Sequence, residues 1–350
     1  MRVALIAPPY IPVPPIKYGG TELFLAHLAA GLRNEGIDAV VYANGESRPE
    51  AELRSLYAKA EWPLPTELDI YKELNQCSWA VRDAIGECDV IHLNSALGLP
   101  LAEFSDKPFV YTVHHALDER LKKFYRFYPR VHYVTISDAQ REQQQLPNSR
   151  TIHHGISLTR YTLVERKQEY LSFLGRIAPV KGVKAAIEIA KKCEIPLKIA
   201  GEVQPLYRDY FENVIHPLID GRFIEYVGEA DLAVKNELLG NSRAMLFPIQ
   251  WDEPFGLVMI EAMACGTPVL ALRRGSVPEV VKDGVSGYVC ADTAEMAERA
   301  CTLELPAAQV RAYVAERFAV ERMVRQYAQL YRQVAATHAK SKPTTGKMTA

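Results

Sequence analysis

Residues 251–269 read WDEPFGLVMIEAMACGTPV, and this stretch decides how the chain folds. An apolar run at 244–247 precedes it. Inside it, a Pro-Phe-Gly turn leads into residues with helical spacing at 257–264, and a second apolar run begins at 269. Strand, loop, helix and strand in this order form the βαβ unit of a parallel sheet. The stretch also carries two glutamates, one before the helix and one inside it.

The βαβ pattern recurs in both halves of the chain. The predicted strands are short and almost entirely apolar, which is typical of parallel strands buried on both faces. They fall at residues 3–7, 39–42, 90–93, 109–113 and 131–136, and again at 170–174, 197–200, 223–227, 244–247 and 269–271. Helical spacing lies at residues 21–34, 71–85, 183–192, 257–264 and 294–302. The two series predict an α/β protein of two doubly wound, Rossmann-like domains facing each other across a cleft.

The domain boundary is predicted at the start of the polar segment 157–169. We assign residues 1–156 to an N-terminal domain and residues 157–319 to a C-terminal domain. A last helix at 320–336 is expected to pack back on the first domain. The Lys/Thr/Ser-rich residues 337–350 are predicted to be a disordered tail, because they contain too little apolar surface to order them.

The composition describes a soluble protein without a nucleic-acid partner. Hydrophobic residues make up 48% of the 350 and charged residues 24%, and 41 basic against 42 acidic residues leave a net charge of −1. No global charge therefore attracts nucleic acid or an acidic membrane. The apolar start of the chain is too short for a signal peptide, and no run approaches the roughly 18 apolar residues of a transmembrane segment. Six cysteines form no Cys-x-x-Cys pair, so we expect a cytoplasmic protein.

The two glutamates are placed to hold a ligand at the edge of the second sheet. Glu253 lies on the loop after a strand, where ligands of open α/β sheets bind. The N–H groups of Phe255, Gly256 and Leu257 lie at the positive end of the following helix, and Glu261 lies further along it. A diphosphate flanked by sugars would use the amides and both carboxylates. The alternative is an acidic residue that favours the helix dipole, together with one solvated glutamate.

The stretch 253–269 resembles the signature of glycosyltransferase family 4 (group 1), which are retaining enzymes of the two-domain GT-B architecture. A second element, Gly175-Arg176 with Lys181-Gly182, resembles the Gly-Arg…Lys-Gly element of that family. Arg176 could fork onto diphosphate oxygens, with Lys181 as a point charge. Two solvated cations are the alternative. The resemblance covers roughly residues 1–330 and is strongest from 170 to 290.

The N-terminal half contributes a glycine turn and a histidine. Gly19 and Gly20, after the first strand, resemble the family's glycine-rich loop and leave room for a phosphate or the acceptor, although a simple helix-entry turn would also explain them. Neither a Gly-x-Gly-x-x-Gly motif for NAD nor a P-loop is present. His114, after the strand at 109–113, matches a family histidine that contacts the donor sugar. His115 points to the opposite side of the strand.

Further strand ends match the family pattern less closely. Ser137-Asp138 occupies the place of its Ser-Glu/Asp pair, and His154 stands where an asparagine is common. Ser276 and Glu279 are interpreted as a capping box of the helix that follows them. The resemblance implies four catalytic residues, Glu253, His114, Arg176 and Lys181. It implies a donor-binding set of Gly19, Gly20, Gly175, Gly201, Gly228, Glu229, Pro254, Phe255, Gly256, Leu257, Val258 and Glu261.

The implied reaction moves a sugar from a nucleoside-diphosphate sugar, UDP- or GDP-linked, to an unidentified hydroxyl acceptor with retention at the anomeric carbon. No Asp-x-Asp metal element is present, so we expect no metal and no cofactor. A sugar phosphorylase of similar fold, or a non-catalytic sugar-nucleotide-binding subunit, are the alternatives. The basic, aromatic residues 117–130 could make weak peripheral contact with a membrane, or could form an ordinary helix whose apolar side faces the core.

Overall fold

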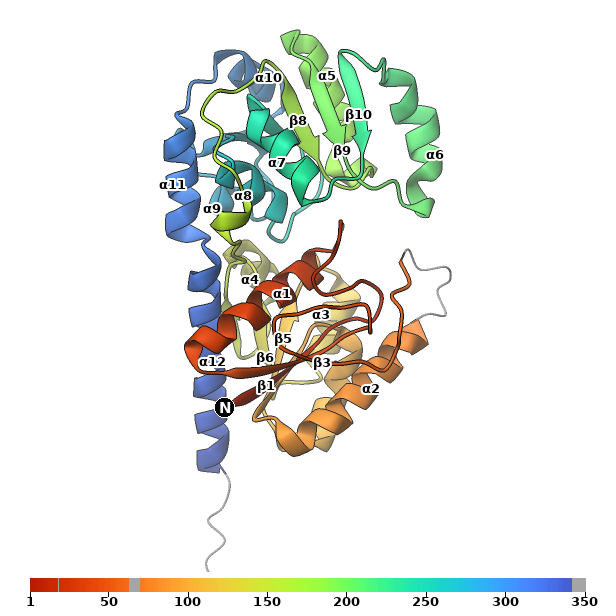
Figure 1. Cartoon of the computed structure of the whole chain (residues 1–350), viewed down its shortest axis with the longest axis vertical. Coiled ribbons are helices and arrows are strands. Elements are labelled where there is room, and N and C mark those ends of the chain that lie inside the picture. Colours follow the sequence, from red (N-terminus) through yellow and green to blue (C-terminus); the bar gives the residue numbers. More distant parts are fainter. Residues whose placement is uncertain (18, 63–69, 342–350) are drawn as a thin grey trace, which may run out of the picture.

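The computed structural model of the chain describes residues 1–17, 19–62 and 70–341 and confirms two parallel sheets, one in each half (Figure 1). The first sheet has seven strands in the order β3-β2-β1-β4-β5-β6-β7, and the second has six in the order β10-β9-β8-β11-β12-β13. Neighbouring strands are parallel in both. In each sheet the order reverses beside the first strand, which is the topological switch point where α/β proteins bind ligands.

The N-terminal domain alternates strands and helices from the start of the chain. Its strands are β1 (Arg2–Ile6), β2 (Asp38–Tyr42), β3 (Glu52–Arg54), β4 (Val90–Leu93), β5 (Phe109–Val113), β6 (His132–Thr135) and β7 (Ser149–Thr151). Its helices are α1 (Gly20–Leu32), α2 (Ile70–Glu87), α3 (Glu119–Tyr125) and α4 (Asp138–Gln144). Successive β1 side chains belong to opposite cores, because Val3 and Leu5 pack with α1 while Ala4 and Ile6 pack with α2.

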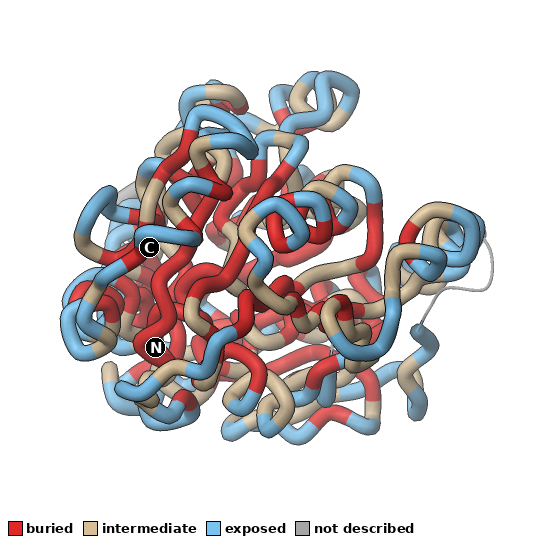
Figure 2. The backbone as a smooth tube through the Cα atoms, turned by 90° about the horizontal axis from the view of Figure 1, so that it is seen from above, coloured by how far each residue is buried: buried red, intermediate tan, exposed pale blue. Residues whose placement is uncertain are grey.

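The C-terminal domain repeats this arrangement. Its strands are β8 (Leu171–Leu174), β9 (Leu197–Ala200), β10 (Ile224–Gly228), β11 (Ala244–Phe247), β12 (Val269–Leu272) and β13 (Gly287–Cys290). Its helices are α5 (Val183–Cys193), α6 (Arg208–Tyr210), α7 (Leu232–Asn241), α8 (Leu257–Ala264), α9 (Val277–Val280), α10 (Thr293–Thr302) and α11 (Ala307–Arg317). Figure 2 shows the buried backbone running through the interior, with exposed stretches around it.

The last helix, α12 (Val320–Ser341), returns from the second domain and packs beside α1 on the first sheet (Figure 1). A side chain at Gly31 of α1 would lie 2.5 Å from Val324, so the two helices approach at a glycine. Tyr327 and Tyr331 are fully buried, and their hydroxyl groups bond Thr112 (2.9 Å) and His92 (2.6 Å) in the sheet. The helix continues to Ser341, so the first residues of the predicted tail are helical, and the rest of that tail lies outside the described residues.

The strands that the sequence did not reveal are polar or short. β3 and β7 lie at the two edges of the first sheet, where side chains reach solvent and an apolar run is not needed. β13 is the corresponding edge strand of the second sheet. The sequence does not reveal β3 and β7 because apolar runs mark only strands buried on both faces, whereas β13 is mostly buried and its absence from the predicted strands has no such reason.

The aromatic residues at 117–130 face mainly inward. Tyr125 is fully buried, and Leu121, Phe124 and Tyr128 pack against the same core. Phe127 is 75% exposed, away from that core. The pattern therefore agrees with a core-facing helix, which was one of the two interpretations. Within the described residues, no helix combines the length and the apolarity needed to cross a membrane.

Candidate active site

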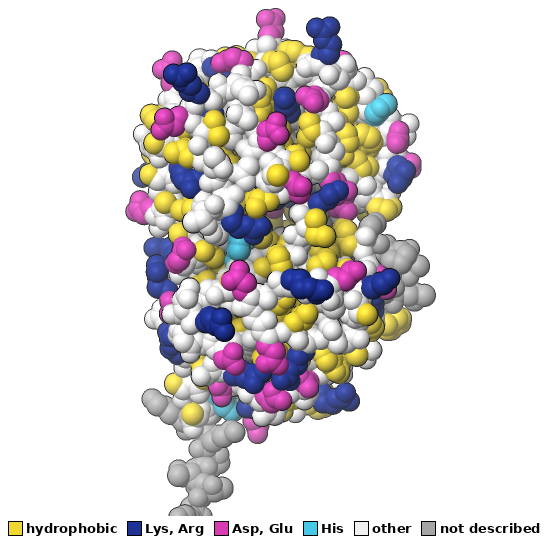
Figure 3. Space-filling view, viewed as in Figure 1, with side chains coloured by type: hydrophobic (Ala, Val, Ile, Leu, Met, Phe, Trp, Pro, Cys, Tyr) yellow, Lys and Arg dark blue, Asp and Glu magenta, His cyan; other side chains and the backbone are white. Residues whose placement is uncertain are grey.

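A pocket of about 310 Å³ lies between the two domains and is lined from both. Figure 3 shows charged side chains and a histidine gathered in the middle of one face, at the level where the domains meet. Of the residues predicted for the site, those in the pocket wall are Gly19, Gly20, His114, Gly175, Arg176, Lys181, Gly201, Glu229, Glu253, Pro254, Phe255, Gly256, Leu257, Val258 and Glu261. Gly228 is not in the wall, but its carbonyl accepts a hydrogen bond from the N–H of Gly201 (2.9 Å).

Glu253, on the loop before α8, contacts a cation and an indole ring. Its Oε2 accepts hydrogen bonds from Lys181 Nζ (2.6 Å) and Trp251 Nε1 (2.7 Å), and Lys181 lies over the indole ring at 4.9 Å. Gly256 begins α8 with φ 77°, a left-handed conformation that glycine adopts without strain. Two residues predicted to act separately therefore form one ion pair, and Trp251 joins them without any signal in the sequence.

Arg176 lies in the same wall at the end of β8. Its Nη1 donates to Gln204 Oε1 (3.3 Å), which belongs to the loop after β9. The N–H of Gly175 donates to Ala200 O (3.0 Å), so the two strand ends are held together beside the pocket. Arg176 and Lys181 thus lie in one wall, as their position after a single strand predicts.

Glu261 is almost fully buried on α8, with 1% of its surface exposed. Lys235 Nζ, from α7, donates to both its carboxylate oxygens (2.9 and 3.1 Å), and the Tyr161 hydroxyl donates to one (2.8 Å). The glutamate is therefore not the solvated residue of the alternative interpretation. Lys235 also lines the pocket and was missed, because a lysine in the first turns of a helix after a strand carries no distinctive spacing.

Lys17 and Trp62 reach across the mouth of the pocket from the N-terminal domain. Lys17 pairs with Glu229 (3.4 Å), and Trp62 Nε1 donates to Glu202 Oε1 (2.8 Å). The Lys17–Glu229 pair is about half exposed on each side, so it contributes little to stability.

Two neutral rings, His114 and His154, form part of the pocket wall that the N-terminal domain contributes. His114 Nε2 bonds Asn94 Oδ1 (2.9 Å), and its ring stacks on His154 with centroids 5.7 Å apart and an interplanar angle of 10°. Burial lowers the pKa of His154 to about 3, and burial together with His154 lowers the pKa of His114 well below its usual value. His115 is not in the pocket wall and bonds the Ala116 carbonyl instead (2.8 Å).

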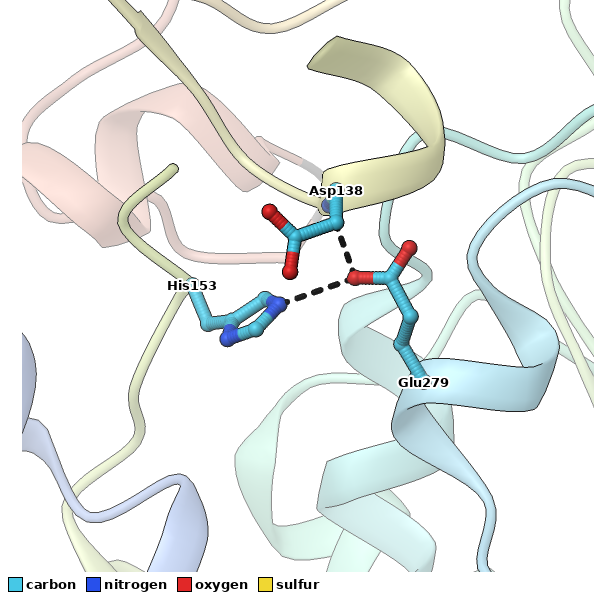
Figure 4. Close-up of side chains that lie close together, drawn as sticks. All are labelled: Asp138, His153 and Glu279. Atoms are coloured by element: carbon cyan, nitrogen blue, oxygen red, sulfur yellow. Dashed lines mark hydrogen bonds and ion pairs between the residues drawn. The ribbon is translucent and has the colours of Figure 1, made fainter. Parts of the chain in front are cut away.

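Glu279 makes a contact between the domains that corrects the sequence interpretation. Its two carboxylate oxygens accept hydrogen bonds from the backbone N–H groups of Asp138 (2.7 Å) and Ala139 (2.6 Å), at the start of α4, and His153 Nε2 donates to one of them (3.0 Å) (Figure 4). The expected capping box is therefore wrong. Ser276 has a helical backbone and donates its hydroxyl to the Phe255 carbonyl (3.0 Å), so it does not cap its own helix.

The contact at Glu279 is electrostatically favourable without a further ligand. The ligand atoms of Asp138, His153 and Glu279 lie within 4.8 Å of one another, but N–H donors already satisfy the Glu279 oxygens. Burial alone would raise the pKa of Glu279, but the hydrogen bonds from His153 and the two backbone N–H groups hold it below its usual value. The loop before Glu279 also bonds the active-site loop, since Ser276 N donates to Glu253 O (3.0 Å).

Two family models match consecutive halves of the chain. The model described as Glycosyltransferase Family 4 matches residues 18–160, and the model described as Glycosyl transferases group 1 matches residues 160–306. Their shared limit at residue 160 agrees with the boundary between the two sheets.

Curated relatives include enzymes with different acceptors. N-acetyl-alpha-D-glucosaminyl L-malate synthase from Bacillus anthracis is 34% identical over 158 residues, which are 43% of this chain and 40% of that protein. Phosphatidyl-myo-inositol mannosyltransferase from Mycobacterium leprae is 24% identical over 332 residues, 85% of this chain and 86% of that protein.

Solved structures share the fold over nearly the whole chain. Sucrose-phosphate synthase from Thermosynechococcus elongatus superimposes with a TM-score of 0.79 at 21% identity, covering 96% of this chain and 99% of that one. HepE from Anabaena, in complex with UDP and glucose, superimposes with a TM-score of 0.76 at 18% identity, and the match covers 95% of this chain and 100% of that one.

Proposed function

This chain belongs to glycosyltransferase family 4, the glycosyl transferases group 1, and from that premise we propose that it moves a sugar from a nucleoside diphosphate to a hydroxyl acceptor with retention at the anomeric carbon. It is a glycosyltransferase of the GT-B fold. The donor, the stereochemistry and the independence from metal are the proposal.

One observation carries the proposal. From the C-terminal domain the pocket collects three cations, Arg176, Lys181 and Lys235, near the start of α8, and the last two are paired with the carboxylates of Glu253 and Glu261. Cations and a helix N-terminus stabilise a diphosphate, and carboxylates accept hydrogen bonds from sugar hydroxyl groups. Bound UDP and glucose in the structurally similar HepE support a donor of this class.

The reaction follows from the placement of these groups. The cations would stabilise the leaving diphosphate as its bond to the sugar breaks. Glu253, held by Lys181 and Trp251, would bind hydroxyl groups of the transferred sugar. The leaving phosphate would accept the proton of the acceptor hydroxyl as that oxygen attacks the same face of the sugar. This route requires neither a protein nucleophile nor a metal ion.

The test combines binding with turnover. Thermal shifts with UDP, GDP, ADP and their sugars identify the donor, since a ligand that binds the folded state raises the melting temperature. The donor found is then incubated with candidate glycans, lipids and small hydroxyl compounds, and the anomeric configuration of the product is read by NMR. Retention, with equal initial rates in EDTA and in magnesium, is expected. Inversion, a rate restored only by metal, or phosphate-dependent release of a sugar phosphate from a disaccharide without any nucleotide would contradict the proposal.

A further inference from the structure

Asn94 lies directly behind the pocket histidine, at the end of β4. It is 7% exposed, and both its backbone N–H and its side-chain Nδ2 donate to the Ile6 carbonyl, each at 3.2 Å. Its side-chain Oδ1 lies 2.9 Å from His114 Nε2. The amide therefore bridges β1 and the residue that follows β5.

These contacts determine which nitrogen of His114 carries the proton. A carbonyl can only accept, so the amide must turn its NH₂ group toward Ile6 and its oxygen toward the ring. An amide oxygen also only accepts, and His114 Nε2 must then be the donor. Because His114 is held neutral in the pocket, its Nδ1 carries no proton and keeps a lone pair.

Two other rings pack against the His114 imidazole. The ring centroid of Phe24 lies 5.1 Å from that of His114, and the two rings are tilted. The centroid of His154 lies 5.7 Å away, and its ring is nearly parallel to that of His114. Among the described residues, no group hydrogen-bonds to His114 Nδ1, although the ring lines the pocket. A lone pair there attracts a hydroxyl group and repels a phosphate oxygen, so His114 Nδ1 suits a sugar hydroxyl and not the diphosphate.

We propose that Asn94 is a positioning residue, which fixes His114 as the Nε2–H tautomer so that Nδ1 accepts a hydrogen bond from a hydroxyl group of the transferred sugar. This inference rests on the proposed sugar-nucleotide donor. It assigns Asn94 no contact with the substrate, and its effect passes through His114 alone.

The neighbouring histidine provides a matched control within the same chain. His115 Nδ1 bonds the Ala116 carbonyl (2.8 Å), which forces the opposite tautomer, and its Nε2 accepts from the Tyr125 hydroxyl. Two adjacent histidines therefore carry their protons on different nitrogens. A substitution at Asn94 should change the protonation of His114 and leave that of His115 unchanged.

The first test reads the tautomers directly, by long-range ¹H–¹⁵N NMR of the full chain. His114→Gln and His115→Gln assign the two signals. Wild type should show His114 protonated at Nε2 and His115 at Nδ1. Asn94→Asp places a carboxylate on Nε2 and should convert His114 to the imidazolium near neutral pH, with His115 unchanged. A wild-type His114 protonated at Nδ1 would overturn the inference even if the enzyme proves to be an active transferase.

The second test uses kinetics with the donor identified above. Asn94→Asp should lower kcat/KM roughly tenfold, the effect of one lost hydrogen bond, and activity should recover as rising pH deprotonates the imidazolium. Binding of the bare nucleoside diphosphate should be unchanged. Combined with His114→Gln, the Asn94 substitution should cost nothing more, as residues acting in series require.

The outcomes separate this inference from the proposed function. If wild type transfers no sugar from any nucleotide, the proposed function fails, while the NMR result still decides the tautomer. If wild type is active but Asn94→Asp remains fully active while His114 is protonated, or if only the KM for the acceptor changes, then Nδ1 does not bind the transferred sugar and the inference is wrong.

Discussion

The two walls of the pocket differ in the chemistry of their side chains. The wall of the C-terminal domain contains buried ion pairs, Lys181 with Glu253 and Lys235 with Glu261. The opposite wall contains glycines, two stacked, neutral histidines and one cation, Lys17, which pairs with Glu229. Charges that are paired with one another can exchange partners with a charged ligand, whereas neutral rings add shape and hydrogen bonds without attracting phosphate. We therefore expect the diphosphate to be held by the C-terminal wall, and the two histidines to face the transferred sugar.

The largest expected effect concerns the buried histidines of the N-terminal domain, of which His154 lines the pocket. Burial lowers the pKa of His92 and His154 to about 3 and that of His27 to about 4, so each ring stays neutral in the fold while it protonates near 6.5 in the unfolded chain. Each of these histidines therefore contributes stability that is full above pH 6.5 and falls below it, by up to roughly 1.4 kcal/mol per pH unit.

Urea unfolding at pH 7, 6 and 5 measures this slope. His154→Asn should reduce this slope by up to roughly 1.4 kcal/mol per pH unit, since one proton fewer is then taken up on unfolding. A slope that is the same in the variant would show that His154 is not held neutral.

The second effect tests the charged wall at the loop before α8. Glu253→Gln should lower kcat by on the order of 10²-fold, because a preorganised contact to the reacting sugar is lost, while bare nucleotide binds nearly as before. Glu261→Gln is the matched control. It should raise KM more than it lowers kcat, because Glu261 is expected to hold the ribose, which does not react. If the bare nucleotide binds more weakly to Glu253→Gln than to Glu261→Gln, the two roles are reversed.

A third change removes one cation from the same wall. Arg176→Ala should weaken binding of the nucleoside diphosphate by on the order of 10- to 100-fold, the effect of one charge-assisted hydrogen bond. Isothermal titration with the nucleoside as control measures it. Equal losses for the nucleoside and its diphosphate would show that Arg176 does not hold the phosphates.

The fourth change removes the contact between the two domains at Glu279. Glu279→Gln removes a carboxylate from the start of α4 and should cost about 1–2 kcal/mol of unfolding free energy. Because its pKa lies below the usual 4.5, this contribution is present above that value and is lost as the pH falls through the lower one.

Urea unfolding of both proteins at pH 7 and pH 3 checks this, and the difference should shrink at pH 3. Glu295, which accepts from Ala291 N (2.8 Å) within the C-terminal domain, is the matched control. Glu295→Gln should leave kcat unchanged, whereas Glu279→Gln should lower it, because the Glu279 loop bonds Glu253. An unchanged kcat in both would separate Glu279 from the active-site loop.

The smallest effect concerns α12, outside the pocket. Tyr331→Phe leaves His92 without its hydroxyl partner and should cost about 1 kcal/mol of unfolding free energy, with kcat and KM unchanged. Chemical denaturation and steady-state rates measure both. A change in kcat would mean that the buried network under α1 reaches the pocket.

Much of the fold could be predicted because its signals are local. Apolar runs mark strands buried on both faces, and a glycine such as Gly256 marks a turn that other residues adopt only with strain. The position of Glu253 after a strand and before a helix was therefore enough to place it at the sheet edge. Polar edge strands such as β7 lack such a signal, because one of their sides faces solvent.

By itself the sequence determined the two βαβ series, the glycine turns and the strand ends at which candidate residues lie, since each depends on neighbours a few positions away. Only the tertiary structure decided the partners of those residues. Glu261 pairs with Lys235, 26 positions away, and bonds Tyr161, 100 positions away, while Glu279 caps a helix 141 positions earlier. A hydrogen bond depends on distance in space, and no local pattern records which distant chain segments folding brings within 3 Å.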